Sequence, residues 1–419
     1  MITPNSASAR IAFVCTDPGI PVFGTKGASV HAQSVIAELS RAGHEVHVIT
    51  PRPGPYEDHR LASAVRLHRL PEIGPGSAAE RELRAMASDC AVAGVLNRIQ
   101  PDLVYERYAL WGRTATRWAV RNRRRSILEV NAPLIDEQAR FRELADPAAA
   151  RRIARSALAS ADAVVCVSSQ VADWARALSS RTETIMVLPN GVDTDRIQPA
   201  GRRIAEGHDR RFTVGFLGTL KPWHGLKSLI DALAELDEPG WRLLVVGDGP
   251  LRAELAARSA TAGIEAEFTG AVPPDQVRDR LQQMDIACAP YPRADDHYFS
   301  PLKIYEYLAA GLPVIASAIG QVPEALDHGT MGRLVTPGDA SALAEALSDL
   351  RQDRPERLRL SVAGRRAAIE RHTWRRVVER ALALVDFSAN GSAAIASSVD
   401  RSDRSETPTA SAAAMGTGR

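Results

Sequence analysis

The chain has 419 residues, 45% of them hydrophobic, and its 52 basic and 50 acidic residues give a formal net charge of +2. A chain of this length is longer than a domain with a single hydrophobic core usually is, which favours two domains. Balanced charge and 5% aromatic content argue against a nucleic-acid-binding protein. No run approaches the roughly 20 apolar residues that cross a bilayer, so we expect a cytoplasmic protein, with peripheral attachment to the inner membrane face as the alternative.

The first half of the chain alternates predicted strands and helices. A buried strand is expected at residues 10–16, a helix from about 29 to 42 that ends at Gly43, and a strand at EVHVIT. Further apolar strands are predicted at PDLVYE, SILEVNA, ADAVVCVSS and TIMVLPNG. This alternation predicts a parallel sheet with helices on both faces, in a first domain of residues 1–195.

The second half repeats this architecture without repeating the sequence. Residues 196–210 are polar and contain Pro and Gly, and we interpret them as a linker. Strands are predicted at TVGFLGTL, WRLLVVGDG, EAEFTG, DIACAPY and PVIAS, within a second Rossmann-like domain at 211–370. A helix is expected at 371–388. The small, polar segment 389–419 is predicted to be disordered, because it buries too little apolar surface to offset chain entropy.

The four cysteines, Cys15, Cys90, Cys166 and Cys288, match no zinc or disulfide spacing. All except Cys90 lie in apolar, strand-like runs, so we expect those three to be buried thiols. This pattern favours a reducing compartment.

Lysine is rare in this chain, and three of the four lysines lie in three loops of the predicted α/β units. The first loop contains Gly24, Lys26 and Gly27, between the first strand and the first helix. Glycines let backbone amides approach an anion, and a helix N-terminus adds partial positive charge. A plain turn is the alternative, because the loop lacks the G-x-G-x-x-G pattern.

The second loop, GFLGTLKPWHG, follows the first strand of the second domain. Its Thr219, Lys221 and His224 provide a hydroxyl, an ammonium and an imidazole that suit a diphosphate. The alternative is that Lys221 and His224 are solvated. Trp223 is expected to contribute packing rather than function.

The third loop and helix, FSPLKIYEYLAAGLP, give the strongest indication of a site. Ser300 is predicted to cap a helix whose first turn contains Pro301, Leu302 and Lys303. The free amides of that turn and the Lys303 ammonium would bind an anion. Glu306 lies one turn further on the same face and could accept both hydroxyls of a ribose. A solvated glutamate is the alternative.

These motifs and others in chain order resemble glycosyltransferase family 4 between about residues 10 and 375: GTKGASVH, EVNAP, LPNGVD, GTLKPWHG, VVGDGP, FTGAV and SPLKIYEYLAAGLPVIAS. The resemblance implies the GT-B fold, an α/β architecture of two Rossmann-like domains with parallel sheets facing a central cleft. It implies a retaining hexosyltransferase that needs no metal and no cofactor beyond a nucleotide-diphosphate sugar as co-substrate. The implied acceptor is a saccharide, a lipid-linked molecule or a small molecule of secondary metabolism, bound by the first domain.

The resemblance also implies roles for individual residues. Glu306 matches the family's ribose-binding glutamate, and the helix around Trp374 matches a segment that packs back toward the first domain. Asn190–Asp193 match the N-G-V-D before the linker. The donor-binding candidates are Gly27, Thr219, Lys221, Gly247, Gly249, Val272, Tyr298, Ser300, Pro301, Leu302 and Glu306.

Four positions depart from the family pattern. Tyr298 replaces a glutamate that usually touches the donor sugar, and one of residues 295–297 would supply the lost polar contact, or sugar recognition differs. Thr219 and His224 replace the usual arginine and lysine of the diphosphate loop. Asn131 replaces a histidine near the reacting sugar.

The expected mechanism is electrostatic stabilisation of the leaving diphosphate by amides and by Lys303, Lys221 and His224. No nucleophilic carboxylate is evident, so a covalent intermediate is not expected. The catalytic candidates are Lys303, His224 and Asn131, and no metal ligands are assigned. The candidates for orienting the acceptor are His31, Glu106 and Glu129, with a cap or a sheet-edge hydrogen bond as the alternative role of each.

Two other functions stay open: an epimerase or phosphorylase of the same fold, and a catalytically silent partner subunit that binds nucleotide sugar. Arg117, Arg121 and residues 123–125 form a basic run. Such a run would allow weak association with acidic lipid, and a solvated helix end is the alternative. The oligomeric state is left open.

Overall fold

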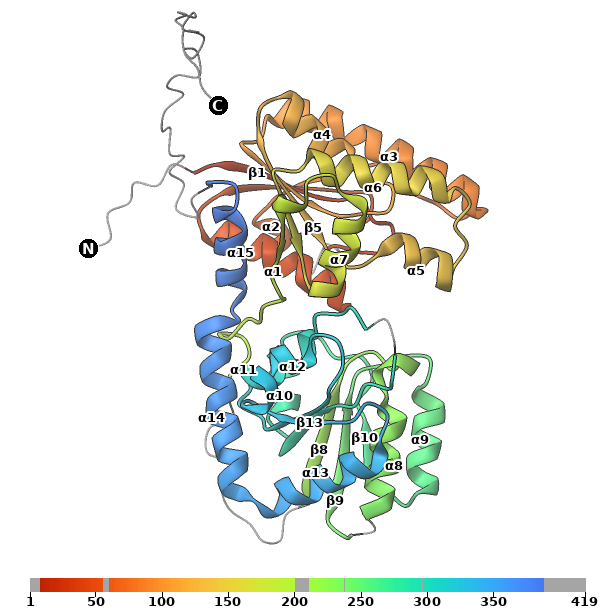
Figure 1. Cartoon of the computed structure of the whole chain (residues 1–419), viewed down its shortest axis with the longest axis vertical. Helices are drawn as coiled ribbons and strands as arrows, with labels where there is room; N and C mark the ends of the chain where they lie inside the picture. Colours follow the sequence, from red (N-terminus) through yellow and green to blue (C-terminus); the bar gives the residue numbers. More distant parts are fainter. Residues whose placement is uncertain (1–7, 56–59, 200–210, 237, 295–296, 388–419) are drawn as a thin grey trace, which may run out of the picture.

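The computed structural model describes residues 8–55, 60–199, 211–236, 238–294 and 297–387. Two parallel sheets lie within them, one in each half of the chain (Figure 1). The predicted two-domain α/β fold is therefore confirmed. The predicted disordered segment 389–419 and residues 200–210 of the predicted linker lie outside the described residues.

The first sheet has seven parallel strands, and its order reverses direction between β1 and β4. Ligands of such sheets bind outside the carboxyl ends of the strands at this switch point. In spatial order the strands are β3 (Arg66–Arg69), β2 (Glu45–Thr50), β1 (Arg10–Cys15), β4 (Leu103–Arg107), β5 (Arg125–Val130), β6 (Ala163–Cys166) and β7 (Ile185–Val187).

Helices cover both faces of the first sheet. Helix α1 begins two residues earlier than predicted, at Gly27, and ends before Gly43, whose φ of 88° and bond to the Ser40 carbonyl form the expected C-terminal cap. The helices of this half are α1 (Gly27–Arg41), α2 (Arg60–Ser63), α3 (Ala78–Ile99), α4 (Thr114–Arg121), α5 (Leu134–Phe141), α6 (Pro147–Ser160), α7 (Ser169–Leu178) and the 3-10 helix η1 (Thr182–Thr184).

The second sheet has six parallel strands and reverses between β8 and β11. In spatial order they are β10 (Ala266–Phe268), β9 (Trp241–Val246), β8 (Phe212–Leu217), β11 (Ile286–Ala289), β12 (Val314–Ser317) and β13 (Arg333–Val335). The helices after β8 are η2 (Pro222–His224), α8 (Leu226–Leu236), α9 (Arg252–Thr261), α10 (Val277–Leu281), α11 (Leu302–Ala309), α12 (Val322–Ala325), η3 (Asp327–Gly329), α13 (Ala340–Gln352), α14 (Arg354–Arg371) and α15 (Trp374–Ala383).

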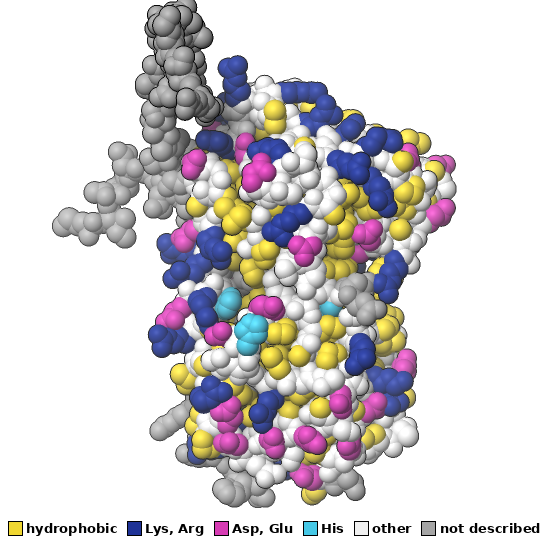
Figure 2. Space-filling model, in the orientation of Figure 1, with side chains coloured by type: hydrophobic (Ala, Val, Ile, Leu, Met, Phe, Trp, Pro, Cys, Tyr) yellow, Lys and Arg dark blue, Asp and Glu magenta, His cyan; other side chains and the backbone are white. Residues whose placement is uncertain are grey.

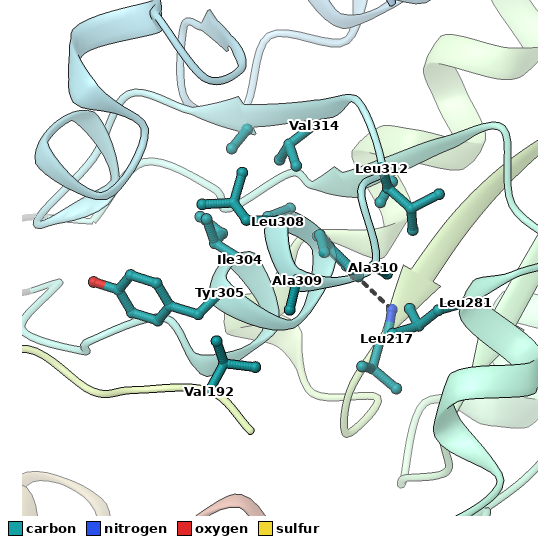
Figure 3. Close-up of a cluster of buried hydrophobic side chains, with 14 of the residues drawn as sticks. Val192, Leu217, Leu281, Ile304, Tyr305, Leu308, Ala309, Ala310, Leu312 and Val314 are labelled. Atoms are coloured by element: carbon teal, nitrogen blue, oxygen red, sulfur yellow. Dashed lines mark hydrogen bonds between the residues drawn. The ribbon is translucent and has the colours of Figure 1, made fainter. Parts of the chain in front are cut away.

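Helix α11 is the element that positions the third predicted loop. Its apolar side chains, including Ile304 and Leu308, pack in the core beneath β12 (Figure 3). The amide of Leu217 donates to the Tyr307 hydroxyl at 2.7 Å. Gly311 follows the helix with a φ of 66°, a conformation that glycine adopts without strain. Packing of its apolar side chains fixes the position of the helix, and Gly311 fixes where it ends.

Helix α15 returns to the first domain, beside α1 (Figure 1). Its Trp374, Val378, Ala381 and Leu382 are buried in the core that α1 forms with one face of the first sheet. Val192 pairs with Thr373 in an isolated parallel bridge, where the two connections between the domains run side by side. The expected return of this helix is therefore seen in the structure.

All four cysteines are free, and Cys15, Cys166 and Cys288 are buried as predicted, whereas Cys90 is exposed. Burial raises the pKa of the Cys15 and Cys166 thiols to about 12. Within the described part of the chain, no helix has the length and hydropathy needed to cross a membrane.

Candidate active site

The helix ends predicted to bind an anion meet at the junction of the two domains. Gly27 opens α1, and a β-carbon there would lie 3.6 Å from Cδ1 of Leu302, the first residue of α11. The first-turn amides of a helix lack intrahelical partners and carry partial positive charge. Two such helix ends therefore converge, one from each domain.

Lys303 is a buried lysine surrounded by aromatic rings. Its Nζ lies 4.1 Å from the ring centre of Phe216 and 5.4 Å from that of Tyr291, and Nζ has no hydrogen-bond partner among the described residues. Cation–π contacts contribute about 1–2 kcal/mol each, less than the several kcal/mol that desolvating an ammonium costs. Burial therefore lowers the pKa of Lys303 to about 7, although Glu306 opposes the shift.

His224 is a partly buried imidazole at the turn after β8. Its Nδ1 contacts the Thr219 carbonyl oxygen, which fixes the ring at the turn after β8. Burial, followed by the nearby Lys303 charge, lowers the pKa of His224 to about 3. The imidazole is therefore neutral at physiological pH in the free protein, and a contact between this imidazole and the leaving diphosphate stays a prediction.

Ser300 is placed differently from the prediction. Pro301 occupies the cap position of α11, and no side chain caps this helix. Instead, the Ser300 Oγ accepts the backbone amide of Asn190 at 3.0 Å, and the Ser300 carbonyl accepts the Asn190 side-chain amide at 3.0 Å. The amides at the start of α11 are thus left open, while Ser300 joins the domains.

Glu306 lies on the same side of α11 as Lys303, as its spacing predicted. Its Oε1 lies 3.4 Å from the guanidinium of Arg196, in the segment between the domains. Burial raises the pKa of Glu306, and Arg196 and Lys303 partly offset the rise. A donor ribose at Glu306 would compete with Arg196 for this carboxylate.

Two of the predicted donor-loop glycines are required by close backbone packing. A β-carbon at Gly247, whose φ is 138°, would lie 2.0 Å from the Gly218 carbonyl oxygen, and one at Gly249 would lie 2.6 Å from the Leu220 amide nitrogen. Val272 is partly buried against the core of the second domain. Close backbone packing therefore explains why these two positions are glycine. A contact between their amides and a ligand would be a second role.

Tyr298 points away from the second domain. Its ring is 8% exposed and belongs to a core cluster of the first domain, and its hydroxyl donates to Oε1 of Glu137 in α5. This residue was assigned to donor binding, but its side chain contacts the first domain instead. The prediction failed because the family pattern at this position describes a glutamate, whereas the longer aromatic ring reaches an apolar cluster.

The loop after β8 presents polar groups to solvent. Thr219 is exposed, and the Lys221 ammonium lies 5.6 Å from the ring centre of Trp223. Trp223 is 45% exposed and contacts the His224 ring edge-on, so the packing expected of it is partial.

In the first domain, His31 and Glu129 meet beneath α15. His31 Nε2 lies 2.8 Å from Glu129 Oε1, and the carboxylate also accepts the Tyr105 hydroxyl at 2.7 Å and the Arg107 guanidinium at 3.1 Å. Burial alone would raise the pKa of Glu129, but His31, Arg107 and Tyr105 outweigh it and lower the pKa to about 2. The Trp374 ring packs edge-on to His31, with ring centres 4.7 Å apart.

Glu106 lies apart from these two residues, on the opposite face of the sheet. Successive side chains of a strand alternate between faces, and Arg107 shares its face with Glu129. Glu106 accepts the Thr116 amide at 3.0 Å, in the first turn of α4, and burial raises its pKa to about 8. The structure favours the alternative role as a helix cap over a contact with the acceptor.

Asn131 follows β5 at the carboxyl edge of the sheet, where the sequence placed it. Neither its amide nitrogen nor its side-chain oxygen has a hydrogen-bond partner among the described residues. An unpaired, buried amide costs free energy, so a partner outside the chain would stabilise it.

A cavity of about 320 Å³ opens at the switch point of the first sheet. The loops after β1 and β4 form part of its wall, through Thr16 and Trp111. Helix α5 contributes Glu137, and Arg142 follows that helix directly. His31, Glu106 and Glu129 do not line it. The position matches that of ligand sites in doubly wound sheets, although no motif in the sequence indicates Glu137.

Fold and site together define a GT-B glycosyltransferase: two Rossmann-like domains, with the uncapped start of α11 facing the domain junction. Residues 25–196 match the family model described as Glycosyltransferase Family 4, and residues 211–353 match that of Glycosyl transferases group 1. The chain belongs to glycosyltransferase family 4.

Similar proteins agree with this assignment. The chain is 27% identical over 372 residues to the D-inositol 3-phosphate glycosyltransferase of Corynebacterium efficiens, covering 82% of this chain and 86% of that protein. A sucrose-phosphate synthase from Thermosynechococcus elongatus shares the fold at a TM-score of 0.69 and 21% identity, over 89% and 97% of the two chains. HepE of Anabaena, solved with UDP-glucose, gives a TM-score of 0.67 at 20% identity, over 90% and 98%. These relatives provide no support for an epimerase, a phosphorylase or a silent subunit.

Proposed function

We propose that the protein transfers a hexosyl group, with retention, from a nucleotide-diphosphate sugar to an acceptor bound by the first domain. The observation that carries the proposal is the juxtaposition of Gly27 and Leu302, where a β-carbon at Gly27 would lie 3.6 Å from Leu302 Cδ1. Beside them, the Lys303 ammonium has no hydrogen-bond partner among the described residues. Open amides and a cation at one point suit a leaving diphosphate, on which negative charge develops as the glycosidic bond breaks.

The acceptor is proposed to occupy the cavity lined by Thr16, Trp111 and Glu137. The named activity of the Corynebacterium relative makes an inositol phosphate the first acceptor to test. Other saccharides and small polyols follow, because the cavity combines polar side chains with apolar walls such as Ile73 and Leu134.

The test is a thermal-shift screen against UDP, GDP, ADP and TDP sugars, followed by transfer assays with the stabilising donor. A ligand that binds only the folded state raises its melting temperature. We expect one nucleotide series to stabilise the protein and to support transfer with retained anomeric configuration. Failure of every donor to bind would refute the proposal.

Independence from metal is part of the proposal. Lys303 and the helix-end amides are expected to supply the positive charge, so chelation with EDTA should leave transfer unchanged. Loss of activity that Mg²⁺ or Mn²⁺ restores would show that these groups are insufficient.

We also propose weak association with anionic membrane surfaces through α4 and the turn after it. Figure 2 shows Lys and Arg side chains along the top of the first domain, where Figure 1 places α3 and α4. Arg117, Arg121 and Arg123 have no ion-pair partner among the described residues, whereas Arg124 lies 3.4 Å from Asp102. Sedimentation with phosphatidylglycerol vesicles should fall as salt rises, and equal sedimentation with neutral vesicles would contradict the proposal.

A further inference from the structure

The segment leading into α11 is held to the first domain by four hydrogen bonds. Ser168 Oγ donates to the Tyr298 carbonyl at 2.7 Å, and Asn190 donates twice to Ser300 at 3.0 Å. The Tyr298 hydroxyl donates to Glu137 Oε1. These bonds fix the segment just before the amides that are proposed to hold the diphosphate.

Each of the first three bonds involves one backbone atom. The fourth joins two side chains from different domains. The Tyr298 ring lies within the apolar cluster of the first domain, although its backbone belongs to the second. A buried phenolic hydroxyl needs a hydrogen-bond partner, and Glu137 provides it. The position of the Tyr298 ring therefore depends on the Glu137 side chain.

Glu137 connects this bond to the cavity of the first domain. Its side chain lines the cavity, and Oε2 receives no hydrogen bond from the residues that the structure describes. Burial raises the pKa of Glu137, with the Arg142 charge opposing the rise. One carboxylate oxygen is thus used by Tyr298, and the other is free for a group in the cavity.

We propose that Glu137 and Tyr298 are a pair of positioning residues that couples acceptor binding to the donor site. An acceptor hydroxyl or amine that donates to Glu137 Oε2 would fix the carboxylate, and Tyr298 would transmit this constraint to the segment before α11. The inference rests on the proposed function, because it assumes that the acceptor occupies the cavity. It gives Tyr298 a role that differs from the donor-sugar contact expected at this position.

The first test compares Tyr298→Phe with Tyr108→Phe in transfer kinetics. Tyr108 is a matched control, because its ring lies in the same cluster and its buried hydroxyl has no partner among the described residues. Tyr298→Phe should lower kcat/KM for the acceptor at least tenfold, through both kcat and KM. The Kd of the nucleotide and the melting temperature should stay near wild type, because the bonds of Ser168 and Asn190 remain. Equal kinetics for the two variants would overturn the proposal.

The second test reaches the same bond from Glu137. Glu137→Gln keeps an oxygen that accepts from Tyr298 but removes the charge facing the cavity, so it should raise the acceptor KM more than it lowers kcat. In the double variant with Tyr298→Phe, the losses should be smaller than the product of the single effects, as expected for coupled residues. Fully multiplicative losses would overturn the coupling. A wild-type protein without transfer would instead refute the proposed function, so the two failures are distinguishable.

Discussion

Lys303 owes its chemistry to burial rather than to a counter-ion. Because its pKa lies near 7 in the free protein, it is a cation below that pH and increasingly neutral above it. A diphosphate prefers the cation and raises the pKa on binding, so the Kd of the nucleotide should increase from pH 7 to pH 9. If binding requires one proton on Lys303, the Kd can increase by at most about tenfold per pH unit.

Isothermal titration of the nucleotide across this range checks the prediction. Lys303→Met removes the ammonium, so it should bind more weakly with a flat pH profile. A wild-type Kd that stays constant from pH 7 to pH 9 would exclude Lys303 from diphosphate binding.

Glu306 is predicted to hold the donor ribose, but the free structure pairs it with Arg196. Glu306→Ala should raise the donor Kd at least tenfold, since it removes an acceptor for two hydroxyls. Arg196→Ala leaves the carboxylate in place and should change the Kd less than threefold. If the two variants weaken binding equally, the ion pair rather than the ribose contact explains the effect.

Site residues were predictable where their position depends on neighbours in the sequence. They were not predictable where it depends on contacts with residues far away in the sequence. The motif around α11 indicated Lys303 and Glu306 because helical spacing places them on one side. Nothing in the sequence indicates that Phe216 and Tyr291 enclose the lysine, since they come from separate strand ends. The same holds for Glu137, whose partner is 161 positions away.

At the scale of elements, the strand-to-helix loops of the second domain depend on glycine. Gly247→Ala would force an alanine into the left-handed region at φ 138° and against the Gly218 carbonyl. Gly263, after α9, has a φ of 68° with nothing within 4 Å of its β-carbon position, so Gly263→Ala is a matched control.

We expect Gly263→Ala to cost about 1–2 kcal/mol of unfolding free energy for the conformation alone. Gly247→Ala adds a steric clash worth about 1–3 kcal/mol and should also weaken donor binding. Chemical denaturation measures the difference, and equal costs would show that the loop relaxes without strain.

Most elements were predictable because their apolar periodicity is strong. The strands in the centre of both sheets are fully buried, and their runs of Val, Ile, Leu and Ala are visible in the sequence. The short edge strands β3 and β13 were not predicted, because partly exposed positions such as Arg66 and Arg333 weaken the pattern. Ser300 was misread as a cap because capping and interdomain bonding need the same residue type.

At the scale of the whole molecule, α15 makes the C-terminal part of the chain a component of the first domain. Trp374 is 3% exposed and contacts His31. Trp374→Ala should lower the unfolding free energy by about 3–5 kcal/mol, whereas Trp223→Ala, at a largely exposed ring, should cost less than about 1 kcal/mol. Comparable losses in the two variants would contradict the packing of α15 described above.

The domain arrangement followed from the repeated α/β rhythm, but the contacts across the junction did not. Asn190 joins Ser300 across 110 positions of sequence, a distance over which periodicity carries no information. These contacts bring the start of α11 opposite the start of α1, and the proposed chemistry depends on that placement.

A crystal structure with the stabilising nucleotide sugar tests this placement most directly. We predict diphosphate oxygens within hydrogen-bond distance of the Leu302 and Lys303 amides and of the Lys303 ammonium, with Gly27 facing them from the first domain. A fully occupied nucleotide whose diphosphate lies away from the start of α11 would contradict the account.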